Sequence, residues 1–154
     1  MSIKVGQAIP DFSFTATNQL SGQFSQFKGK KVVLYFYPKD NTPGCTIESQ
    51  GFRDNNAEFE AANTIILGIS KDKLTSHEKF KANQCMPFEL INDEDTSICT
   101  LFDVLKDKSM FGVKYRGIER STFLIDEHGI LRQEWRKVKV FGHVKAVLEA
   151  AKAI

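Results

Sequence analysis

Hydrophobic and polar positions along the chain follow strand and helix periods in alternation. Residues 32–37 (VVLYFY) form a continuous apolar run of β-branched and aromatic side chains, which predicts a central strand covered on both faces. Residues 64–70 and 88–92 repeat this pattern, and we expect them to lie parallel to the first strand. In residues 9–16, phenylalanines alternate with polar neighbours, as in a half-buried strand.

Helices are expected between and after these strands, at about 45–61, 75–84 and 142–153, with a short helix ending near 104. Thr42 followed by Pro43 is a start signal for the first helix, because it combines a capping hydroxyl with a proline in the first turn. Gly51 weakens the middle of the same helix.

Near the end of the chain, residues 121–125 and 130–135 flank a turn and predict a β-hairpin. A β-α-β start, a further strand–helix unit, this hairpin and a closing helix describe an α/β protein. We expect a thioredoxin-like three-layer sandwich with a central mixed β-sheet flanked by helices. A flavodoxin-like sheet would need another parallel strand in place of the hairpin. Because the chain has 154 residues and no linker or repeat, residues 1–154 are expected to form a single domain.

Composition narrows the class of protein. Hydrophobic residues make up 42% of the chain and charged residues 26%, which is typical of a soluble globular protein. The net charge is only +2 and is spread along the chain, which favours neither nucleic acid nor a membrane surface as a partner. No run reaches the roughly 18 apolar residues of a membrane span, and residues 1–12 lack the apolar core of a signal peptide. We therefore expect a cytoplasmic location.

The three cysteines, Cys45, Cys85 and Cys99, are too few and of the wrong parity for a disulfide framework. In a reducing compartment they should be thiols at rest. The cysteines and histidines are scattered without ligand spacing, and no glycine-rich phosphate or dinucleotide loop follows a strand. We therefore expect no metal and no cofactor, and we look instead for a reactive thiol.

Cys45 has the most informative position of the three. It follows the strand at 32–37 after Pro38 and a short loop, so it is expected in the first turn of a helix at the carboxyl edge of a central strand. Open α/β sheets bind ligands at that edge. The first N–H groups of a helix carry partial positive charge and stabilise an anion such as a thiolate. From spacing alone, a small buried cysteine that fills the core is an equally good interpretation.

A reactive thiolate needs further polar groups around its substrate. Thr42 lies three residues before Cys45, and its hydroxyl can accept a hydrogen bond from a substrate and donate one to a thiolate. The backbone N–H groups of Gly44 and Cys45 can donate into the same place. An arginine is the natural additional partner, because it stays charged and its planar fork holds geometry.

Residues 36–46 (FYPKDNTPGCT) resemble the peroxidatic loop of peroxiredoxins, whose pattern is Pro-x-x-x-Thr/Ser-x-x-Cys, and the TPGCT form is similar to the bacterioferritin-comigratory (Q-type) branch. The resemblance covers nearly the whole chain in order, continuing through IS, SH, PF, KSMFG and GIERSTFLID at 69–70, 76–77, 87–88, 108–112 and 117–126. It implies a thioredoxin-fold thiol peroxidase that reduces hydrogen peroxide and organic hydroperoxides, with a role in antioxidant defence and redox homeostasis.

The resemblance also implies a role for each matching residue. Cys45 would be the peroxidatic cysteine, oxidised to a sulfenic acid while water or an alcohol leaves. Pro38 would shield its sulfur, and Thr42 would bind both sulfur and peroxide. Arg120 would help to activate the thiolate and hold the peroxide oxygen. Glu48, one helical turn after Cys45, would hydrogen-bond neighbouring groups.

One departure from the family pattern concerns the second half of the reaction cycle. Many members of the branch carry a resolving cysteine five residues after the first, where this chain has Gln50. A second subgroup carries it on the next helix, at a position that aligns near Lys81. Three alternatives stay open: a one-cysteine cycle completed by an external thiol, or resolution by Cys85 or by Cys99. The resemblance implies thioredoxin as reductant and a monomer, while glutathione and glutaredoxin come into consideration without an obvious resolving thiol.

Other functions of a cysteine fit the chain less well. A disulfide oxidoreductase of the same fold would need Cys-x-x-Cys, but Cys45 is followed by Thr-Ile-Glu. A cysteine hydrolase would need a paired base, and His77, His128 and His143 occupy unsuitable positions. A cysteine phosphatase loop would need arginine where the chain has Gly51. A catalytically silent interaction protein would have no need of the intact peroxidatic set.

Overall fold

The computed structural model describes residues 3–154, which are arranged around one seven-stranded sheet. The strand order is β2-β1-β5-β4-β3-β8-β9, and β6 and β7 form a separate two-stranded sheet. The strands are β1 (Ser13–Ala16), β2 (Ser21–Gln23), β3 (Lys31–Phe36), β4 (Thr64–Ser70), β5 (Glu89–Asn92), β6 (Leu105–Met110), β7 (Val113–Ile118), β8 (Ser121–Ile125) and β9 (Leu131–Trp135). The helices are the 3-10 helix η1 (Phe24–Phe27), α1 (Pro43–Asp54), α2 (Asn56–Ala61), α3 (Leu74–Gln84), α4 (Ser97–Leu101) and α5 (His143–Ala153).

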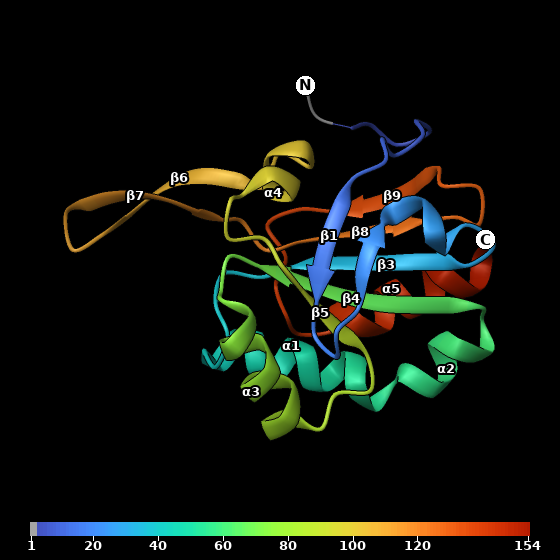
Figure 1. Ribbon diagram of the computed structural model, residues 1–154, viewed down its shortest axis with the longest axis horizontal. Coiled ribbons are helices and arrows are strands. Elements are labelled where there is room, and N and C mark those ends of the chain that lie inside the picture. The colour runs from blue at the N-terminus through green and yellow to red at the C-terminus, as the bar shows by residue number, and fades with distance from the viewer. Residues whose placement is uncertain (1–2) are drawn as a thin grey trace.

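The middle of the sheet confirms the central strand and the layered α/β architecture predicted from the sequence. Every residue of β3 is buried, and the strand pairs in parallel with β4 and antiparallel with β8. Its side chains alternate between two cores. Val33 and Tyr35 pack with α1, α2, α3 and α5, whereas Leu34 and Phe36 pack with α4 and η1. Figure 1 shows α1, α2 and α3 together below the sheet and α4 above it.

The parallel strands β3, β4 and β5 bring their carboxyl ends to one edge of the sheet, because they share direction and register. The loops after these strands lead into α1, α3 and α4 at this edge. Strand β8 runs the other way and starts there, with Ser121 opposite Phe36. Arg120, the residue before β8, therefore lies at the same edge of the sheet as the start of α1.

The first long helix differs from the sequence-based expectation. The predicted helix at 45–61 is two helices, α1 and α2, separated at Asn55, whose side chain donates a 2.8 Å hydrogen bond to the carbonyl of Gly51. Gly51 does not interrupt α1. A Cβ at this position would lie 2.9 Å from Cγ2 of Val144, so glycine lets α1 pack closely against α5. The predicted hydroxyl cap is also wrong, because Thr42 Oγ1 donates to the Lys39 carbonyl at 2.8 Å and not to the helix.

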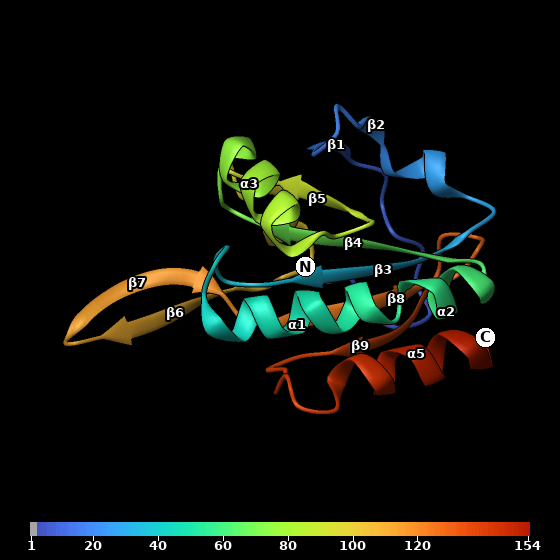
Figure 2. The same ribbon diagram turned by 90° about the horizontal axis from the view of Figure 1, so that it is seen from below.

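The hairpin of β6 and β7 was not anticipated from the sequence. It projects away from the main sheet in both ribbon views (Figures 1 and 2). Most of its side chains are exposed or half-buried, so the segment lacks the hydrophobic alternation of a strand with one covered face. The predicted hairpin of β8 and β9 and the closing helix α5 are both confirmed. None of the helices within residues 3–154 combines the length and apolar character needed to cross a bilayer.

Candidate active site

Cys45 lies in the first turn of α1 and is buried. Its sulfur accepts a 3.3 Å hydrogen bond from Nη2 of Arg120, which reaches it from the residue before β8. The Arg120 side chain is 16% exposed, whereas Cys45 has no exposed surface. The sulfur is thus covered by protein, and the arginine side chain beside it is partly exposed.

The guanidinium of Arg120 is held at both ends of its fork. While Nη2 faces Cys45, Nη1 donates a 2.6 Å hydrogen bond to Oε1 of Glu48, one helical turn after Cys45 on the same face of α1. Burial lowers the pKa of Arg120, but the negative charges of Glu48 and Cys45 outweigh this effect and raise the pKa above its ordinary value. Gly44 leaves room for the group, since a Cβ there would lie 3.1 Å from Nη2.

Glu48 is a buried carboxyl group whose ionisation falls near neutrality. Burial raises its pKa to about 7, although the neighbouring Arg120 acts in the opposite direction. Its Oε2 atom has no hydrogen-bond partner among residues 3–154, and Nε2 of His143 lies 3.9 Å away. That nitrogen pairs at 2.8 Å with Oγ1 of Thr122. Burial, assisted by Arg120, lowers the pKa of His143 to about 4, so its ring is neutral at pH 7.

Sequence reasoning singled out Glu48 through the family pattern but passed over His143. A histidine at the start of a helix carries no sequence signal of proximity to a residue nearly 100 positions earlier. Only the packing of α5 on α1, allowed by Gly51, places the imidazole beside the carboxylate.

The loop between β3 and α1 contains the remaining predicted site residues, Pro38 and Thr42. Both are half-buried, and the carbonyl of Thr42 accepts a hydrogen bond from the Thr46 N–H in the first turn of α1. The Thr42 hydroxyl is directed to the carbonyl of Lys39 in this conformation. The loop therefore places Pro38 and Thr42 at the same sheet edge as Cys45 and Arg120, while their contacts with a peroxide stay a prediction.

Asp40 anchors this loop from within. Its buried carboxylate accepts hydrogen bonds from the Tyr37 hydroxyl at 2.6 Å and from the Ser76 hydroxyl at 2.8 Å, and it lies 2.8 Å from Nδ1 of His77. The backbone N–H of Asp40 donates to Asp72 at 2.9 Å. These contacts join the loop before Cys45 to the start of α3 and to the end of β4.

His77 completes the anchor, because each of its two ring nitrogens has a polar neighbour. Its Nε2 lies 3.0 Å from the carbonyl of Ile91, and its Nδ1 lies 2.8 Å from the Asp40 carboxylate. Both ring nitrogens of this buried side chain are therefore in contact with polar groups of the protein. Asp40, Asp72 and His77 also bring potential metal-ligand atoms within 4.8 Å of one another. Because these atoms already bond within the protein, we interpret the cluster as a structural lock.

The other two cysteines lie away from the sulfur of Cys45. Cys85 is exposed at the end of α3, next to Gln84, which hydrogen-bonds Gln50 in the middle of α1 at 2.8 Å. Cys99 is buried in α4, and its N–H donates to Asp93 at 2.7 Å. Burial, reinforced by Asp93, raises the pKa of the Cys99 thiol far above its ordinary value. Cys99 is therefore a poor nucleophile in the folded protein.

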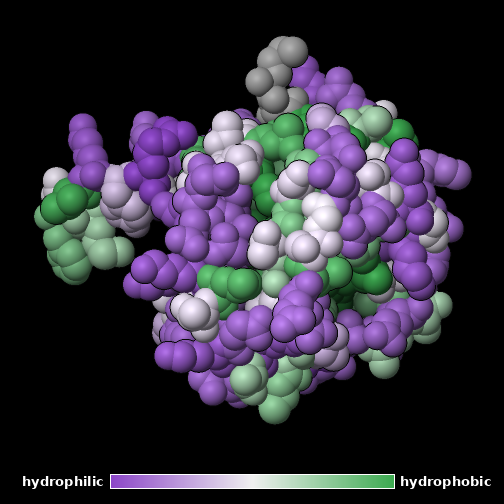
Figure 3. All heavy atoms as spheres, viewed as in Figure 1, coloured by the Kyte–Doolittle hydropathy of each residue, from purple (hydrophilic) through white to green (hydrophobic). Residues whose placement is uncertain are grey.

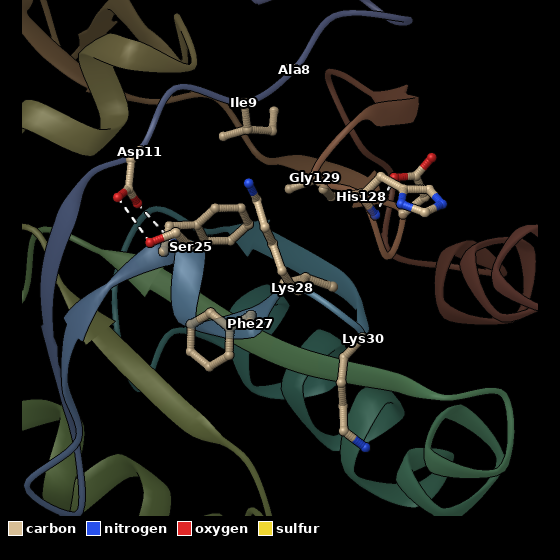
Figure 4. Close-up of a pocket in the computed structure, with 13 residues that line it drawn as sticks. Ala8, Ile9, Asp11, Ser25, Phe27, Lys28, Lys30, His128 and Gly129 are labelled. Atoms are coloured by element: carbon tan, nitrogen blue, oxygen red, sulfur yellow. Dashed lines mark hydrogen bonds between the residues drawn. The ribbon is translucent and has the colours of Figure 1, made fainter.

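A separate cavity of about 250 Å³ lies at the opposite edge of the sheet, where β3 begins and β8 ends. Figure 4 shows Ile9 and Phe27 in its walls, with Lys28 and His128 at its rim and Asp11 hydrogen-bonded to Ser25. Since Cys45 follows the other end of β3, this cavity is not part of the thiol site.

Comparisons with known proteins agree with this geometry. Residues 5–134 match the AhpC/TSA family. The chain is 47% identical over 152 residues to peroxiredoxin Bcp of Bacillus subtilis, covering 99% of this chain and 97% of the relative. A solved peroxiredoxin Q from Xanthomonas campestris is 45% identical with a TM-score of 0.88, covering 92% of this chain and 90% of that chain. The structure of a PrxQ mutant from Xylella fastidiosa is 38% identical with a TM-score of 0.93, covering 99% and 98%.

These matches confirm the thioredoxin-like fold and the resemblance recognised in the sequence. They extend over almost the entire chain, so they include both the loop before Cys45 and Arg120, the residue before β8. The chain therefore belongs to the AhpC/TSA family of peroxiredoxins, in its Bcp or peroxiredoxin Q branch.

Proposed function

We propose that this protein is a thiol peroxidase that reduces hydrogen peroxide and organic hydroperoxides at Cys45. The observation that carries this proposal is the 3.3 Å contact between Nη2 of Arg120 and a sulfur at the start of a helix. Both features favour the thiolate, the nucleophilic form of cysteine. A solved structure of the Xanthomonas campestris bacterioferritin comigratory protein, 44% identical to this chain, was described in relation to that protein's alkyl peroxide reduction activity.

The reaction follows from the positions of the charged groups. The Cys45 thiolate attacks the terminal oxygen of the peroxide, forming a sulfur–oxygen bond while the oxygen–oxygen bond breaks. The departing hydroxide or alkoxide takes up a proton and leaves as water or an alcohol, and Cys45 becomes a sulfenic acid. Arg120 stabilises the negative charge as it moves from sulfur to the departing oxygen. Thr42 and the first N–H groups of α1 orient the peroxide.

Regeneration by an external thiol is the cycle that the structure supports best. A first thiol condenses with the Cys45 sulfenic acid to give a mixed disulfide and water, and a second thiol releases reduced Cys45 and a new disulfide. Cys99 is buried with a raised thiol pKa, and Cys85 lies beside the middle of α1. We propose thioredoxin as the reductant, with glutaredoxin and glutathione as alternatives, for a monomer that acts in cytoplasmic antioxidant defence.

Peroxide consumption tests the peroxidase function. The wild-type protein with thioredoxin, thioredoxin reductase and NADPH should consume hydrogen peroxide, and Cys45→Ser should abolish this activity. Cys99→Ser is the matched control, because it changes an equally buried cysteine outside the site. An inactive wild type, or full activity in Cys45→Ser, would contradict the proposal.

Mass spectrometry after one equivalent of peroxide tests the cycle separately. A one-cysteine cycle predicts a sulfenic acid on Cys45 that dimedone traps, with Cys85 and Cys99 still reduced. A loss of two hydrogens with a linked Cys45–Cys85 peptide would show internal resolution by Cys85. That result would overturn the one-cysteine cycle and leave the peroxidase function intact.

A further inference from the structure

The hairpin of β6 and β7, Leu105–Ile118, forms an arm that extends from the body of the protein (Figures 1 and 2). Its two strands pair only with each other among the described residues. An isolated two-stranded hairpin is marginally stable in water, so extending this one into solvent contributes little to the stability of the fold. We therefore looked for a role of the arm in contacts with another molecule.

The outer part of the arm is apolar. We define the tip as Met110, Phe111, Val113 and Tyr115, whose exposed fractions are 57%, 98%, 65% and 42%. Figure 3 shows green, hydrophobic residues clustered at the end of the arm, at the far left of the molecule. Clustered exposed apolar side chains are a mark of protein interaction sites.

Positively charged residues are spread along the whole arm. It carries four basic residues, Lys106, Lys108, Lys114 and Arg116, against one acidic residue, Asp107, so its net charge is +3 while that of the whole chain is +2. One face of the arm carries a shallow, open hollow of about 530 Å³. The hollow is lined by Asp107, Lys108, Ser109, Lys114, Tyr115 and Arg116. An acidic surface would complement this face.

The base of the arm adjoins the active site. Strand β7 ends at Ile118, two residues before Arg120, and Lys108 Nζ donates to the Ile118 carbonyl at 2.5 Å. Burial and the charge of Arg120 lower the pKa of Lys108, while the charges of Glu119 and Cys45 act in the opposite direction. The arm thus begins within the electrostatic field of the reactive thiol.

We propose that the arm is the docking element for the protein thiol that reduces Cys45, an acidic protein with an apolar surface around its reactive cysteine. This inference rests on the proposed peroxidase function. The partner's thiol attacks the Cys45 sulfenic acid and forms a mixed disulfide as water leaves. The partner's second cysteine then attacks the sulfur of the partner's first cysteine in the mixed disulfide. This step releases Cys45 as a thiol and leaves the partner with an internal disulfide.

The geometry favours this occupant over a second copy or a membrane. Two arms of net charge +3 repel each other, which disfavours pairing between copies through this surface. Strands of six residues span about 20 Å, so a flat membrane that contacts the tip stays far from Cys45. A globular acidic protein that lies alongside the arm contacts the tip, the cationic face and the base together, with its cysteine at the active site.

Substitutions in the tip test the docking surface against a matched control. Val113→Ser and Phe111→Ser remove apolar contacts from the tip. Val5→Ser makes the same change as Val113→Ser at a residue that is 53% exposed in a turn beside the start of β9, at the opposite edge of the sheet. For each variant, kcat/KM for reduced, acidic thioredoxin is divided by the turnover rate supported by dithiothreitol, a thiol too small to use the arm.

We expect this ratio to fall at least about tenfold for Phe111→Ser and Val113→Ser, a change of about 1.4 kcal/mol. It should stay at the wild-type value for Val5→Ser. Lys114→Glu should lower the ratio at low ionic strength and make kcat/KM for thioredoxin less sensitive to salt.

Ratios of the tip variants equal to that of Val5→Ser would overturn the docking role. An unchanged ratio with a wild-type dimer that Phe111→Ser dissociates, seen by sedimentation, would also overturn it and assign the tip to self-association. Absence of peroxide turnover with dithiothreitol in the wild type would refute the peroxidase function, and the docking role with it. Circular dichroism of each variant separates these results from loss of folding.

Discussion

Nη1 of Arg120 donates a 2.6 Å hydrogen bond to Oε1 of Glu48, so the cation that faces the Cys45 sulfur is held by a carboxyl group of the same helix. Cys45 and Glu48 lie one turn apart on α1, whereas Arg120 arrives from the start of β8. The reactive arrangement therefore exists only while the first two turns of α1 are formed and docked on the sheet.

Replacing Arg120 by lysine should separate charge from geometry. Lysine keeps the positive charge but lacks the fork, so it serves either Glu48 or the sulfur and not both. We expect the second-order rate constant for oxidation by hydrogen peroxide to fall by about 10²–10³ in Arg120→Lys. Stopped-flow fluorescence of Trp135, which packs against His143 with ring centroids 5.9 Å apart, can follow the reaction.

Arg132→Lys is the control for that experiment, because Arg132 is 47% exposed on β9 and, among residues 3–154, pairs with Asp126 alone. Its oxidation rate should match the wild type. An Arg120→Lys variant that reacts as fast as Arg132→Lys would show that charge alone, without the fork, is sufficient.

Glu48 makes the stability of the protein depend on pH in a defined direction. Burial raises its pKa from 4.5 to about 7, so between these values the folded chain keeps a proton that the unfolded chain releases. The free energy of unfolding contributed by Glu48 is highest below pH 4.5 and falls by about 3 kcal/mol as pH rises to 7. Glu48→Gln removes this dependence, so the variant should gain stability relative to wild type across the same window and no further above it.

Urea denaturation of both proteins from pH 4 to 8 measures this difference. The lowered pKa of His143 has the opposite effect, raising stability as pH increases through about 4 to 6.5, but it is present in both proteins and largely cancels in the comparison. Parallel stability curves for Glu48→Gln and wild type would contradict a raised pKa for Glu48.

Asp40→Asn should show how strongly the loop before Cys45 is anchored. Asparagine keeps the shape but removes a buried carboxylate that accepts hydrogen bonds from Tyr37 and Ser76 and contacts His77. We expect a loss of about 1–3 kcal/mol in the free energy of unfolding, the cost of leaving a buried polar group without its hydrogen-bond partner. The control Asp54→Asn alters a pair whose aspartate is 63% exposed and should cost less than about 1 kcal/mol. Equal stability of the two variants by urea denaturation would refute the lock.

The Thr42 hydroxyl is expected to bind peroxide although it contacts the Lys39 carbonyl here. Thr42→Val removes the hydroxyl at nearly constant volume and should slow oxidation of Cys45 about tenfold or more, the effect of one hydrogen bond of about 1.5 kcal/mol. Thr42→Ser keeps the hydroxyl and should restore most of the rate. If Thr42→Val oxidises as fast as Thr42→Ser and the wild type in stopped-flow measurements, the hydroxyl does not bind peroxide during the reaction.

Local pattern was sufficient for the central strands and for the position of Cys45. The apolar run at 32–37 predicts a strand covered on both faces, as observed for β3. Pro38 and Pro43 then mark the loop after the strand and the start of α1. The helix break at Asn55 was not predictable in this way, because it depends on a side-chain hydrogen bond to Gly51. The arm was not predicted either, because strands exposed on both faces carry no hydrophobic alternation.

The sequence by itself determined that a thiol lies at the start of a helix after a buried strand. Hydrophobic periodicity and turn signals depend only on residues that are close in the sequence. Only the tertiary structure decided what surrounds that thiol. Arg120 meets Glu48 because β8 pairs antiparallel with β3, and His77 meets Asp40 because α3 packs beside the loop. Such contacts join residues tens of positions apart, and their energies depend on burial, which no local pattern encodes.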